Sequence, residues 1–449
     1  MQLPASFLAL MQELLGSEAG DFFEALSAPH PTSIRFNTLK NINRSENSDG
    51  VKWCSDGIYL PERPVFTLDP RFHAGAYYVQ EASSMLIGEA VRQLADLSGP
   101  LRVLDLCAAP GGKTTHLASI LPAGSLLVAN EVIRSRYQVL DYNLTKWGSA
   151  NKMATSQQVN QFRGLKSFFD LILIDAPCSG EGMFRKDPQA IAEWSPENVA
   201  RCSVRQQQIL ADAIPMLKPN GLLLYSTCTY NDAENTDNAD WLQQEFPLTP
   251  LPLNLPADWG IAERSIGYQC YPHRVRGEGF YLAAFQKSGS GSGSGKSKGA
   301  KKFKYYQALS RAGQQALKRF IRPDADLVFL ESDKGQIIAL PEAIREDALQ
   351  MSAYSKYFRM GTPVGIIKGK DLVPDPALAL STLLHPEFPR IELDREQAIR
   401  FLRREDPVVT GPAGWQLVTF DGLPLGWVKV LKNRVNNYYP KEWRIRMSV

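Results

Sequence analysis

The chain has 449 residues and a mass of 50.0 kDa, enough for about three domains at roughly 150 residues each. Hydrophobic residues make up 44% and charged residues 22%, which argues against a disordered chain, a collagen and a coiled coil. No run of about 18 apolar residues occurs, and the N-terminus lacks the basic start of a signal peptide. These features predict a cytoplasmic protein without a membrane partner. The six cysteines are scattered and form no CxxC pair, so neither a disulfide scaffold nor a bound metal is expected.

Residues 1–40 have apolar positions at helical spacing and then turn extended, and short strands broken by prolines continue to residue 80. Residues 81–94 predict a helix. From residue 101 onward, short apolar strands alternate with helices. This alternation is typical of a parallel, doubly wound α/β sheet. The predicted strands span 101–106, 125–130, 170–175, 221–227 and 277–286.

Residues 287–302 read KSGSGSGSGKSKGAKK, a composition that behaves as flexible coil, whether natural or engineered. The tail beyond it predicts a compact α+β module with a helix over 305–321. The expected organisation therefore has four parts: 1–80, 81–286, the linker 287–302, and 303–449.

Charge is unevenly spread along the chain. From Lys296 to the C-terminus, 26 Lys and Arg face 17 Asp and Glu, a net charge of +9, whereas the whole chain carries only +3. A basic tail on an acidic body favours a polyanion partner such as RNA, although an ordinary solvated face would give the same count.

The first motif, DLCAAPGGKTTHLA (105–118), places a Gly-rich turn between a strand and a helix. Ligands of doubly wound sheets bind at such turns, at the carboxyl ends of strands. Glu131 ends the next strand, where a carboxylate can accept hydrogen bonds from ribose hydroxyls. The spacing fits neither GxGxxG nor GxxxxGK[ST], which disfavours a nicotinamide cofactor and a P-loop nucleotide. A purely structural turn is the alternative.

Two further motifs place cysteines at the same sheet edge. DAPCSGEGMFRKDP (175–188) follows one strand, and YSTCTYNDAEN (225–235) follows another, with a helix expected to begin near Asn231. A thiol at a helix N-terminus can form a thiolate, the nucleophile of covalent catalysis. Cys178 and Cys228 are thus candidates for catalysis, and a disulfide is the alternative.

Together with RVRGEGFYLAAFQK and HPTSIRFNTLK, these motifs resemble the Sun-type (Nol/Nop/Sun) RNA (cytosine-5)-methyltransferases, which use S-adenosylmethionine. The tail sequence LGWVKVLKNRVNNYYPKEWRI is similar to the RNA-binding, PUA-like extension of the bacterial branch that modifies 16S ribosomal RNA. The resemblance implies a Rossmann-like methyltransferase domain between an N-terminal α+β RNA-binding region and a C-terminal α+β module.

The resemblance also implies roles at matching positions. Cys228 would be the nucleophile, Cys178 would assist product release, and Asp175 would lie between cofactor and base. Gln158 stands where the family often has an acid against the adenine. The turn around the methionine part of the cofactor would comprise Cys107, Ala108, Ala109, Pro110, Gly111, Gly112 and Lys113.

The expected protein is a monomeric enzyme that forms 5-methylcytosine in ribosomal RNA, free or in the small subunit, through a cysteine adduct at carbon 6. A transfer RNA methyltransferase and a non-catalytic, RNA-binding assembly factor are the alternatives.

Arg35 and Asn37 are expected to contact RNA or to make structural hydrogen bonds. The tail has a string of aromatic and cationic residues that fits either an RNA surface or a buried aromatic core with a basic rim. The string comprises Trp427, Lys429, Lys432, Arg434, Tyr438, Tyr439, Lys441 and Arg444.

Overall fold

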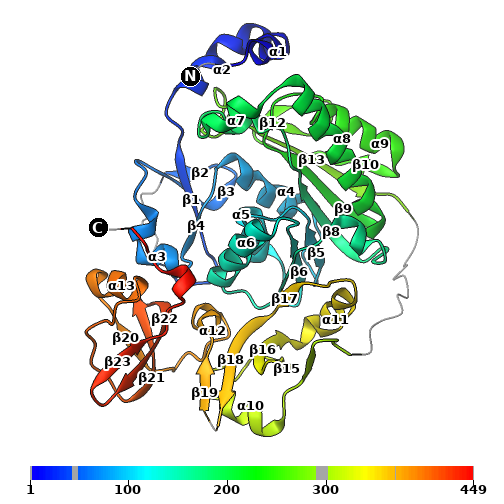
Figure 1. Cartoon of the computed structure of the whole chain (residues 1–449). Coiled ribbons are helices and arrows are strands. Elements are labelled where there is room, and N and C mark those ends of the chain that lie inside the picture. Colours follow the sequence, from blue (N-terminus) through cyan, green and yellow to red (C-terminus); the bar gives the residue numbers. More distant parts are fainter. Residues whose placement is uncertain (1–2, 43–48, 290–301, 370, 448–449) are drawn as a thin grey trace.

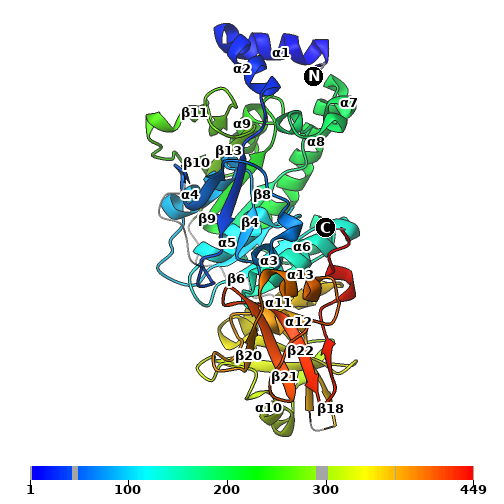
Figure 2. The same cartoon turned by 90° about the vertical axis from the view of Figure 1, so that its left-hand side faces the viewer.

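A computed structural model describes residues 3–42, 49–289, 302–369 and 371–447. Figures 1 and 2 show the N-terminal helices at one end, a central sheet flanked by helices in the middle, and the C-terminal part at the other end. Among the described residues, none of the helices has the length and apolarity needed to cross a bilayer.

The N-terminal region combines two helices with a small antiparallel sheet. Phe7 of α1 (Ala5–Leu15) and Phe22 of α2 (Ala19–Ser27) pack edge-on against Trp194 and Tyr230 of the central domain. The sheet has the order β2-β3-β1-β4, and a short helix precedes its last strand. Their bounds are β1 (Thr32–Phe36), β2 (Gly50–Val51), β3 (Cys54–Leu60), α3 (Pro70–His73) and β4 (Tyr77–Val79).

The largest sheet within the described residues has ten strands, in the order β11-β12-β13-β9-β8-β5-β6-β7-β17, with β10 paired to β13. Strands β5 to β9 are parallel to their neighbours, whereas β13 and β17 add antiparallel strands. The predicted doubly wound α/β fold is therefore confirmed. The bounds are β5 (Arg102–Asp105), β6 (Leu126–Asn130), β7 (Lys152–Thr155), β8 (Phe169–Asp175), β9 (Leu217–Thr227), β10 (Leu248–Pro250), β11 (Ala262–Glu263), β12 (Tyr268–Cys270), β13 (Phe280–Lys287) and β17 (Phe358–Met360).

Helices cover both faces of this sheet because its strands are apolar on both sides. Val103 and Leu127 join the core on the side of α4 (Leu86–Leu94) and α5 (Gly112–Ile120). Leu104 and Val128 point the other way, into the core on the side of α8 and α9. The remaining helices of the domain are α6 (Arg134–Trp147), α7 (Pro188–Glu193), α8 (Pro196–Ala213) and α9 (Thr236–Glu245).

The C-terminal part, expected as one α+β module over 303–449, contains two sheets whose residues share a core. One sheet has the order β14-β15-β16-β18-β19, and the other has the order β20-β21-β22-β23. The helix predicted over 305–321 is shorter, because Tyr306–Ala308 forms β14 and α10 begins only at Arg311. The other bounds are α10 (Arg311–Leu317), β15 (Leu327–Ser332), β16 (Gln336–Pro341), α11 (Arg345–Ala353), β18 (Thr362–Lys368), β19 (Asp371–Pro374), α12 (Pro376–Leu380), β20 (Arg390–Glu392), α13 (Arg395–Leu402), β21 (Gly414–Phe420), β22 (Leu423–Leu431) and β23 (Arg434–Asn437).

The C-terminal part packs directly on the central domain. Strand β17 pairs with β7 and so extends the central sheet, and Ile344 and Met351 join the apolar core on the α8 side. Asp347 of α11 also forms an ion pair with Arg102 at 2.8 Å. The Gly-Ser composition alone predicted a tail on a flexible tether. Most of that segment, 290–301, lies outside the described residues, and the tail beyond it shares a core with the body.

Candidate active site

The two cysteine loops follow the neighbouring parallel strands β8 and β9, so the carboxyl ends of these strands bring Cys178 and Cys228 together. Their sulfurs are 3.0 Å apart, and the backbone amide of Cys228 donates to the Cys178 sulfur at 3.4 Å. The sequence predicted this common edge because each cysteine directly follows a strand of the predicted parallel sheet. Both thiols are free, which disfavours the disulfide alternative.

Two buried carboxylates hold the cysteine loops against each other. Glu181, on the Cys178 loop, accepts the backbone N–H groups of Tyr230 and Asn231 at 2.7 and 3.0 Å. Glu234, on the Cys228 loop, accepts the N–H of Ser179 at 2.9 Å. The side-chain amide of Asn231 donates to both carboxylates, at 2.8 and 2.9 Å. Each loop therefore provides the acceptor for the backbone of the other.

Close approach of these loops requires Gly182. Its N–H donates to the carbonyl of Cys228 at 2.8 Å, and a Cβ there would lie 2.8 Å from that same oxygen. A side chain at this position would push the loops apart.

The hydrogen bond with Cys228, together with burial, raises the pKa of Cys178 well above its ordinary value, so Cys178 keeps its proton at neutral pH. The helix expected near Asn231 begins only at Thr236, because residues 229–235 form the turn that bonds Glu181 and Glu234. The expectation that a helix N-terminus adjoins Cys228 is therefore wrong.

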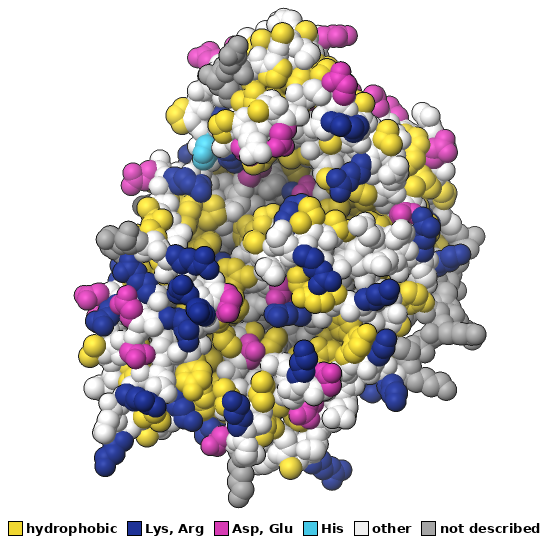
Figure 3. Space-filling model, viewed as in Figure 1, with side chains coloured by type: hydrophobic (Ala, Val, Ile, Leu, Met, Phe, Trp, Pro, Cys, Tyr) yellow, Lys and Arg dark blue, Asp and Glu magenta, His cyan; other side chains and the backbone are white. Residues whose placement is uncertain are grey.

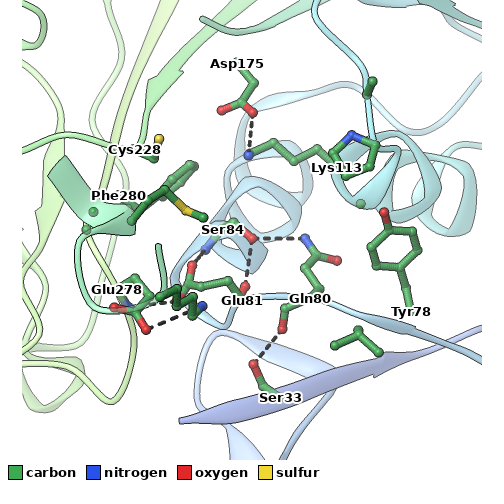
Figure 4. A pocket seen from close by; sticks show the side chains of 18 of the residues that line it. Ser33, Tyr78, Gln80, Glu81, Ser84, Lys113, Asp175, Cys228, Glu278 and Phe280 are labelled. Carbon is green, nitrogen blue, oxygen red and sulfur yellow. Dashed lines mark hydrogen bonds and ion pairs between the residues drawn. The ribbon is translucent and has the colours of Figure 1, made fainter. Parts of the chain in front are cut away.

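Asp175 ends strand β8 beside the cysteine pair. Its carboxylate accepts from the Lys113 ammonium at 2.7 Å (Figure 4). It also accepts from the Ser226 hydroxyl at 2.9 Å. Burial alone would lower the pKa of Lys113, but the charge of Asp175 and their hydrogen bond outweigh it and raise that pKa. Lys113 is therefore a fixed cation in the site, and its ammonium also lies 5.1 Å from the centre of the Phe280 ring.

The Gly-rich turn lies between β5 and α5, as predicted. Gly111, the N-cap of α5, has a φ of 112°, which glycine adopts without strain. Side chains of α6 hold the turn from outside: Arg136 donates to the Ala109 carbonyl and Asn143 to the Pro110 carbonyl, each at 2.8 Å. This arrangement leaves the inner side of the turn open to a ligand.

One cavity, of about 480 Å³, runs from this turn along the ends of β6 and β7. Glu131 lines it, nearly buried, with its carboxylate accepting from the Ile133 N–H at 2.9 Å. Gln158, an exposed residue of the loop after β7, lines the same cavity. Cys107 lines it as well, and burial raises the pKa of this thiol, which argues against a reactive thiolate there.

A second cavity, of about 540 Å³, lies between the central domain and the N-terminal sheet. Figure 4 shows Tyr78, Lys113, Phe280 and Cys228 around this cavity. Gly279 also lines it, and a side chain at that position would clash with the ring of Tyr230. Residues 107–113 also line this cavity, except Gly111, the N-cap of α5. The two cavities meet, because both are lined by Cys107, Ala109, Arg136, Asp175, Met183 and Cys228.

Asp105 is a site residue that the sequence reasoning did not identify. It is fully buried at the end of β5; one carboxylate oxygen accepts from the Thr114 hydroxyl at 2.6 Å. The other oxygen has no hydrogen-bond partner among the described residues, yet Asp105 lines the larger cavity. Burial raises the pKa of Asp105 to about 7. Its position directly before the Gly-rich turn was the signal that could have identified it.

Arg35 and Asn37 have structural roles, so the alternative of RNA contact is wrong for both. Arg35 is fully buried and donates to Gln80, the Gly112 carbonyl and Thr115. Asn37 is equally buried and donates to the carbonyls of Gly75 and Trp147. Both side chains tie the N-terminal sheet to helices α5 and α6.

The aromatic and cationic string of the tail divides between core and surface. Trp427 and Tyr439 are buried, and Trp427 packs at 5.0 Å from Phe388. Lys432, Arg434 and Lys441 are exposed. Figure 3 shows Lys and Arg side chains spread over the middle and lower parts of the face seen in Figure 1, below a hollow next to the N-terminal helices. The described residues contain no group of three or more side chains suited to a metal ion.

Three family profiles match successive parts of the chain. They are described as the N-terminal domain of 16S rRNA methyltransferase RsmF (residues 3–82), 16S rRNA methyltransferase RsmB/F (94–286) and the methyltransferase RsmF PUA domain (388–445). The last match covers the sheet β20-β21-β22-β23.

Individual proteins are similar over the full length. The ribosomal RNA small subunit methyltransferase F of Aliivibrio fischeri strain MJ11 is 33% identical, over 98% of this chain and 97% of that protein. The protein of the same name from Cronobacter sakazakii is 32% identical, over 98% and 96%. The crystal structure of a methyltransferase homolog protein from Pyrococcus horikoshii superimposes with a TM-score of 0.55 and 29% identity, covering 63% of this chain and 94% of that one.

Proposed function

The chain belongs to the ribosomal RNA small subunit methyltransferase F family, and on that premise we propose that it transfers a methyl group from S-adenosylmethionine to carbon 5 of a cytosine in 16S ribosomal RNA. The observation that carries the proposal is the pair of thiols, 3.0 Å apart, beside Asp175 where two cavities meet. One cavity suits the cofactor and the other suits an unstacked base.

The cofactor fits the smaller cavity and the groups around the Gly-rich turn. In this cavity Glu131 would bind the ribose hydroxyls and Gln158 the adenine edge. The turn from Cys107 to Lys113, where the two cavities meet, would surround the methionine part. The unpartnered oxygen of buried Asp105 is a suitable acceptor for the ammonium group of the methionine part. When bound, S-adenosylmethionine supplies an electrophilic methyl group.

Cys228 is the proposed nucleophile. Carbon 5 of cytosine is too weak a nucleophile by itself, and addition of the Cys228 thiolate to carbon 6 places electron density on carbon 5. Lys113 places a positive charge in the same cavity, and a cation stabilises a nearby thiolate. Asp175, held by Lys113 and Ser226, would orient the ring of the base.

Cys178 is the proposed helper in product release. After methyl transfer, a base must accept the carbon-5 proton. The electrons of that C–H bond then re-form the double bond between carbons 5 and 6, and the bond between carbon 6 and the Cys228 sulfur breaks. Cys178 is protonated and 3.0 Å away, so its S–H can donate a hydrogen bond to the departing thiolate. Cys178 therefore favours cleavage of the adduct.

RNA fits the larger cavity because that cavity opens between the central domain and the N-terminal sheet. A base must leave its stack to enter it, which single-stranded or loop RNA permits at least cost. The N-terminal region and the basic C-terminal part would bind the flanking RNA. The net charge of +9 from Lys296 to the C-terminus would attract the phosphates to the C-terminal part.

The test is methyl transfer from labelled S-adenosylmethionine to 16S ribosomal RNA, to assembled small subunits and to transfer RNA. The modified nucleoside is then identified by mass spectrometry. We expect 5-methylcytosine in ribosomal RNA, and none with Cys228→Ala, whose cofactor binding should be unchanged. Methylation of transfer RNA alone would favour the transfer RNA alternative. RNA binding without methyl transfer would favour an assembly factor, and another methylated nucleoside would exclude the cytosine-5 mechanism.

A further inference from the structure

A short segment of the C-terminal part, residues 354–360, lies against the loop that lines the smaller cavity. Its strand β17 pairs antiparallel with β7, so that Phe358 faces Thr155 and Met360 faces Met153. The N–H of Ser156, the first residue after β7, donates to the carbonyl of Tyr357 at 3.2 Å. The pairing thus continues into the loop that holds Gln158.

The side chain of Gln157 fastens this loop to the C-terminal segment. Its amide nitrogen donates to the carbonyl of Tyr354 at 2.8 Å, and its amide oxygen accepts the N–H of Lys356 at 3.1 Å. Gln157 is only 6% exposed, so both bonds are shielded from water. Gln157 uses its whole amide on this segment, whereas the next residue, Gln158, lines the cavity.

The contacts continue from Gln157 to the Gly-rich turn through Asn130, the last residue of β6. Asn130 exchanges two hydrogen bonds with the backbone of Gln157, at 3.0 and 3.2 Å. Its amide also donates to the Leu106 carbonyl at 3.3 Å, and its own carbonyl accepts the N–H of Ala108 at 2.9 Å. A displaced Gln157 would therefore disturb both ends of the cavity.

Tyr357 supports the third side of the same cavity. The guanidinium of Arg134 lies 3.9 Å from the centre of the Tyr357 ring, and the ring of Tyr137 lies 5.3 Å away. Both partners belong to the first turn of α6, which follows directly after Glu131 and Ile133. The C-terminal segment thus contacts the start of the helix that follows the proposed ribose ligand.

We propose that Gln157 is a positioning residue through which the C-terminal segment 354–360 shapes the cofactor cavity, so that docking of this segment and cofactor binding strengthen each other. The inference rests on the proposed function, because it takes S-adenosylmethionine as the ligand of that cavity. Coupling of this kind is reciprocal: if the segment increases cofactor affinity, bound cofactor must stabilise the segment by the same free energy.

The test compares two variants, each of which removes a different contact between the central domain and the C-terminal part. Gln157→Ala removes a contact at the carboxyl edge of the central sheet, beside the cavity. Asp347→Asn removes the ion pair with Arg102, which starts β5 at the opposite, amino edge. Each variant removes one contact between the C-terminal part and the central domain, but only Gln157→Ala removes a contact of segment 354–360 with the loop that lines the cavity.

Titration calorimetry of the full-length protein with S-adenosylmethionine tests the proposal. We expect Gln157→Ala to raise the dissociation constant about tenfold, the effect of losing two shielded hydrogen bonds. Asp347→Asn should bind as tightly as the wild type. In turnover with saturating RNA, Gln157→Ala should raise the KM for S-adenosylmethionine and leave kcat within about twofold.

A second measurement needs no variant. Hydrogen exchange in wild-type peptides covering 354–360 should slow when S-adenosylmethionine is added, because bound cofactor stabilises the segment. Unchanged exchange there, or equal affinity losses in Gln157→Ala and Asp347→Asn, would overturn the proposal. Failure of the wild type to bind S-adenosylmethionine at all would instead contradict the proposed function, and the inference with it.

Discussion

Cys178 and Cys228 differ in their surroundings although their sulfurs are 3.0 Å apart. The hydrogen bond to Cys228 and burial keep Cys178 protonated, so it is suited to assist a leaving thiolate rather than to attack. We therefore expect Cys178→Ala to form the adduct with RNA and release it slowly. A denaturing gel with labelled 16S ribosomal RNA should show a shifted band that the wild type does not accumulate.

The control for that experiment is the double variant Cys178→Ala, Cys228→Ala, which should give no shifted band because the nucleophile is missing. Normal turnover by Cys178→Ala without a band would remove Cys178 from the mechanism. A band that persists in the double variant would show that another residue forms the bond.

Asp105 gives the fold a specific pH dependence. Its pKa is about 7 in the folded protein because of burial, against an ordinary value of 3.8. The folded state therefore holds a proton that the unfolded state loses above pH 4. The resulting stabilisation is complete below about pH 4, declines as pH rises, and is lost once pH passes about 7.

The matched variant is Asp105→Asn, whose amide oxygen can still accept from Thr114. Between pH 5.5 and 7.0 the wild type should lose about 1.6 kcal/mol more unfolding free energy than the variant, since each pH unit corresponds to about 1.4 kcal/mol and Asp105 is already half ionised at pH 7. Thermal melts at both pH values measure the difference. Parallel pH dependence in the two proteins would mean that Asp105 does not titrate in this range.

At the scale of elements, the cysteine loops depend on their buried carboxylates. Glu181 is fully buried and accepts from Trp194, Tyr230 and Asn231, so Glu181→Ala would leave these donors without an acceptor. Buried groups left unpaired cost about 1–3 kcal/mol each. We expect hydrogen exchange in residues 176–183 and 228–235 to rise at least about tenfold in this variant.

Glu193→Ala is the control, because Glu193 is exposed at the end of α7 and accepts only from the exposed Gln189 among the described residues. Exposed substitutions of this kind change stability by less than about 0.5 kcal/mol. If hydrogen exchange in both cysteine loops stayed at the wild-type rate in Glu181→Ala, the hydrogen bonds of Glu181 would not be needed to keep these loops in place.

Sequence patterns predicted the elements whose signals are local. The apolar runs that became β5, β6, β8 and β9 predicted the parallel sheet, and the position of each cysteine directly after a strand predicted that both lie at one edge. The three-residue strand β17 and the pairing of Glu181 with a distant loop have no such local signal. Both arise only when segments far apart in sequence meet.

Burial explains the remaining differences. A guanidinium or an indole suits an RNA surface and also a buried network, so Arg35 and Trp427 could not be assigned from residue type. Arg35 turned out to bond helix α5, and the indole of Trp427 donates to the Asp375 carbonyl at 2.9 Å. Asp105 was not predicted as a site residue, because the sequence cannot tell whether both oxygens of a carboxylate at a strand end have hydrogen-bond partners. Only the structure shows that one oxygen of Asp105 is buried without a partner among the described residues.

At the scale of the whole molecule, the tail is part of one body with the active site, which changes how its RNA affinity has to be measured. Removing the tail would expose the core that it shares with the central domain and would cut β17 from the central sheet. Loss of binding after truncation would therefore not separate RNA contact from structural damage. Charge substitutions on exposed residues of the full-length chain avoid this problem.

The exposed cations Lys432, Arg434 and Lys441 are the part of the tail string suited to phosphate contact. Replacing all three by Ala should weaken binding to a 16S ribosomal RNA fragment. The slope of log affinity against log salt should become less steep by about 2, since each phosphate contact with single-stranded RNA contributes about 0.7.

The control variant replaces three other exposed lysines, Lys318, Lys334 and Lys368. It removes the same charge from the sheet that contains β15, β16 and β18 and from the end of α10. If binding depends on net charge alone, both triple variants will lose affinity equally and their slopes will match. If the string contacts RNA, the slope will change only in the first, and methylation at saturating RNA will proceed at the wild-type rate in both.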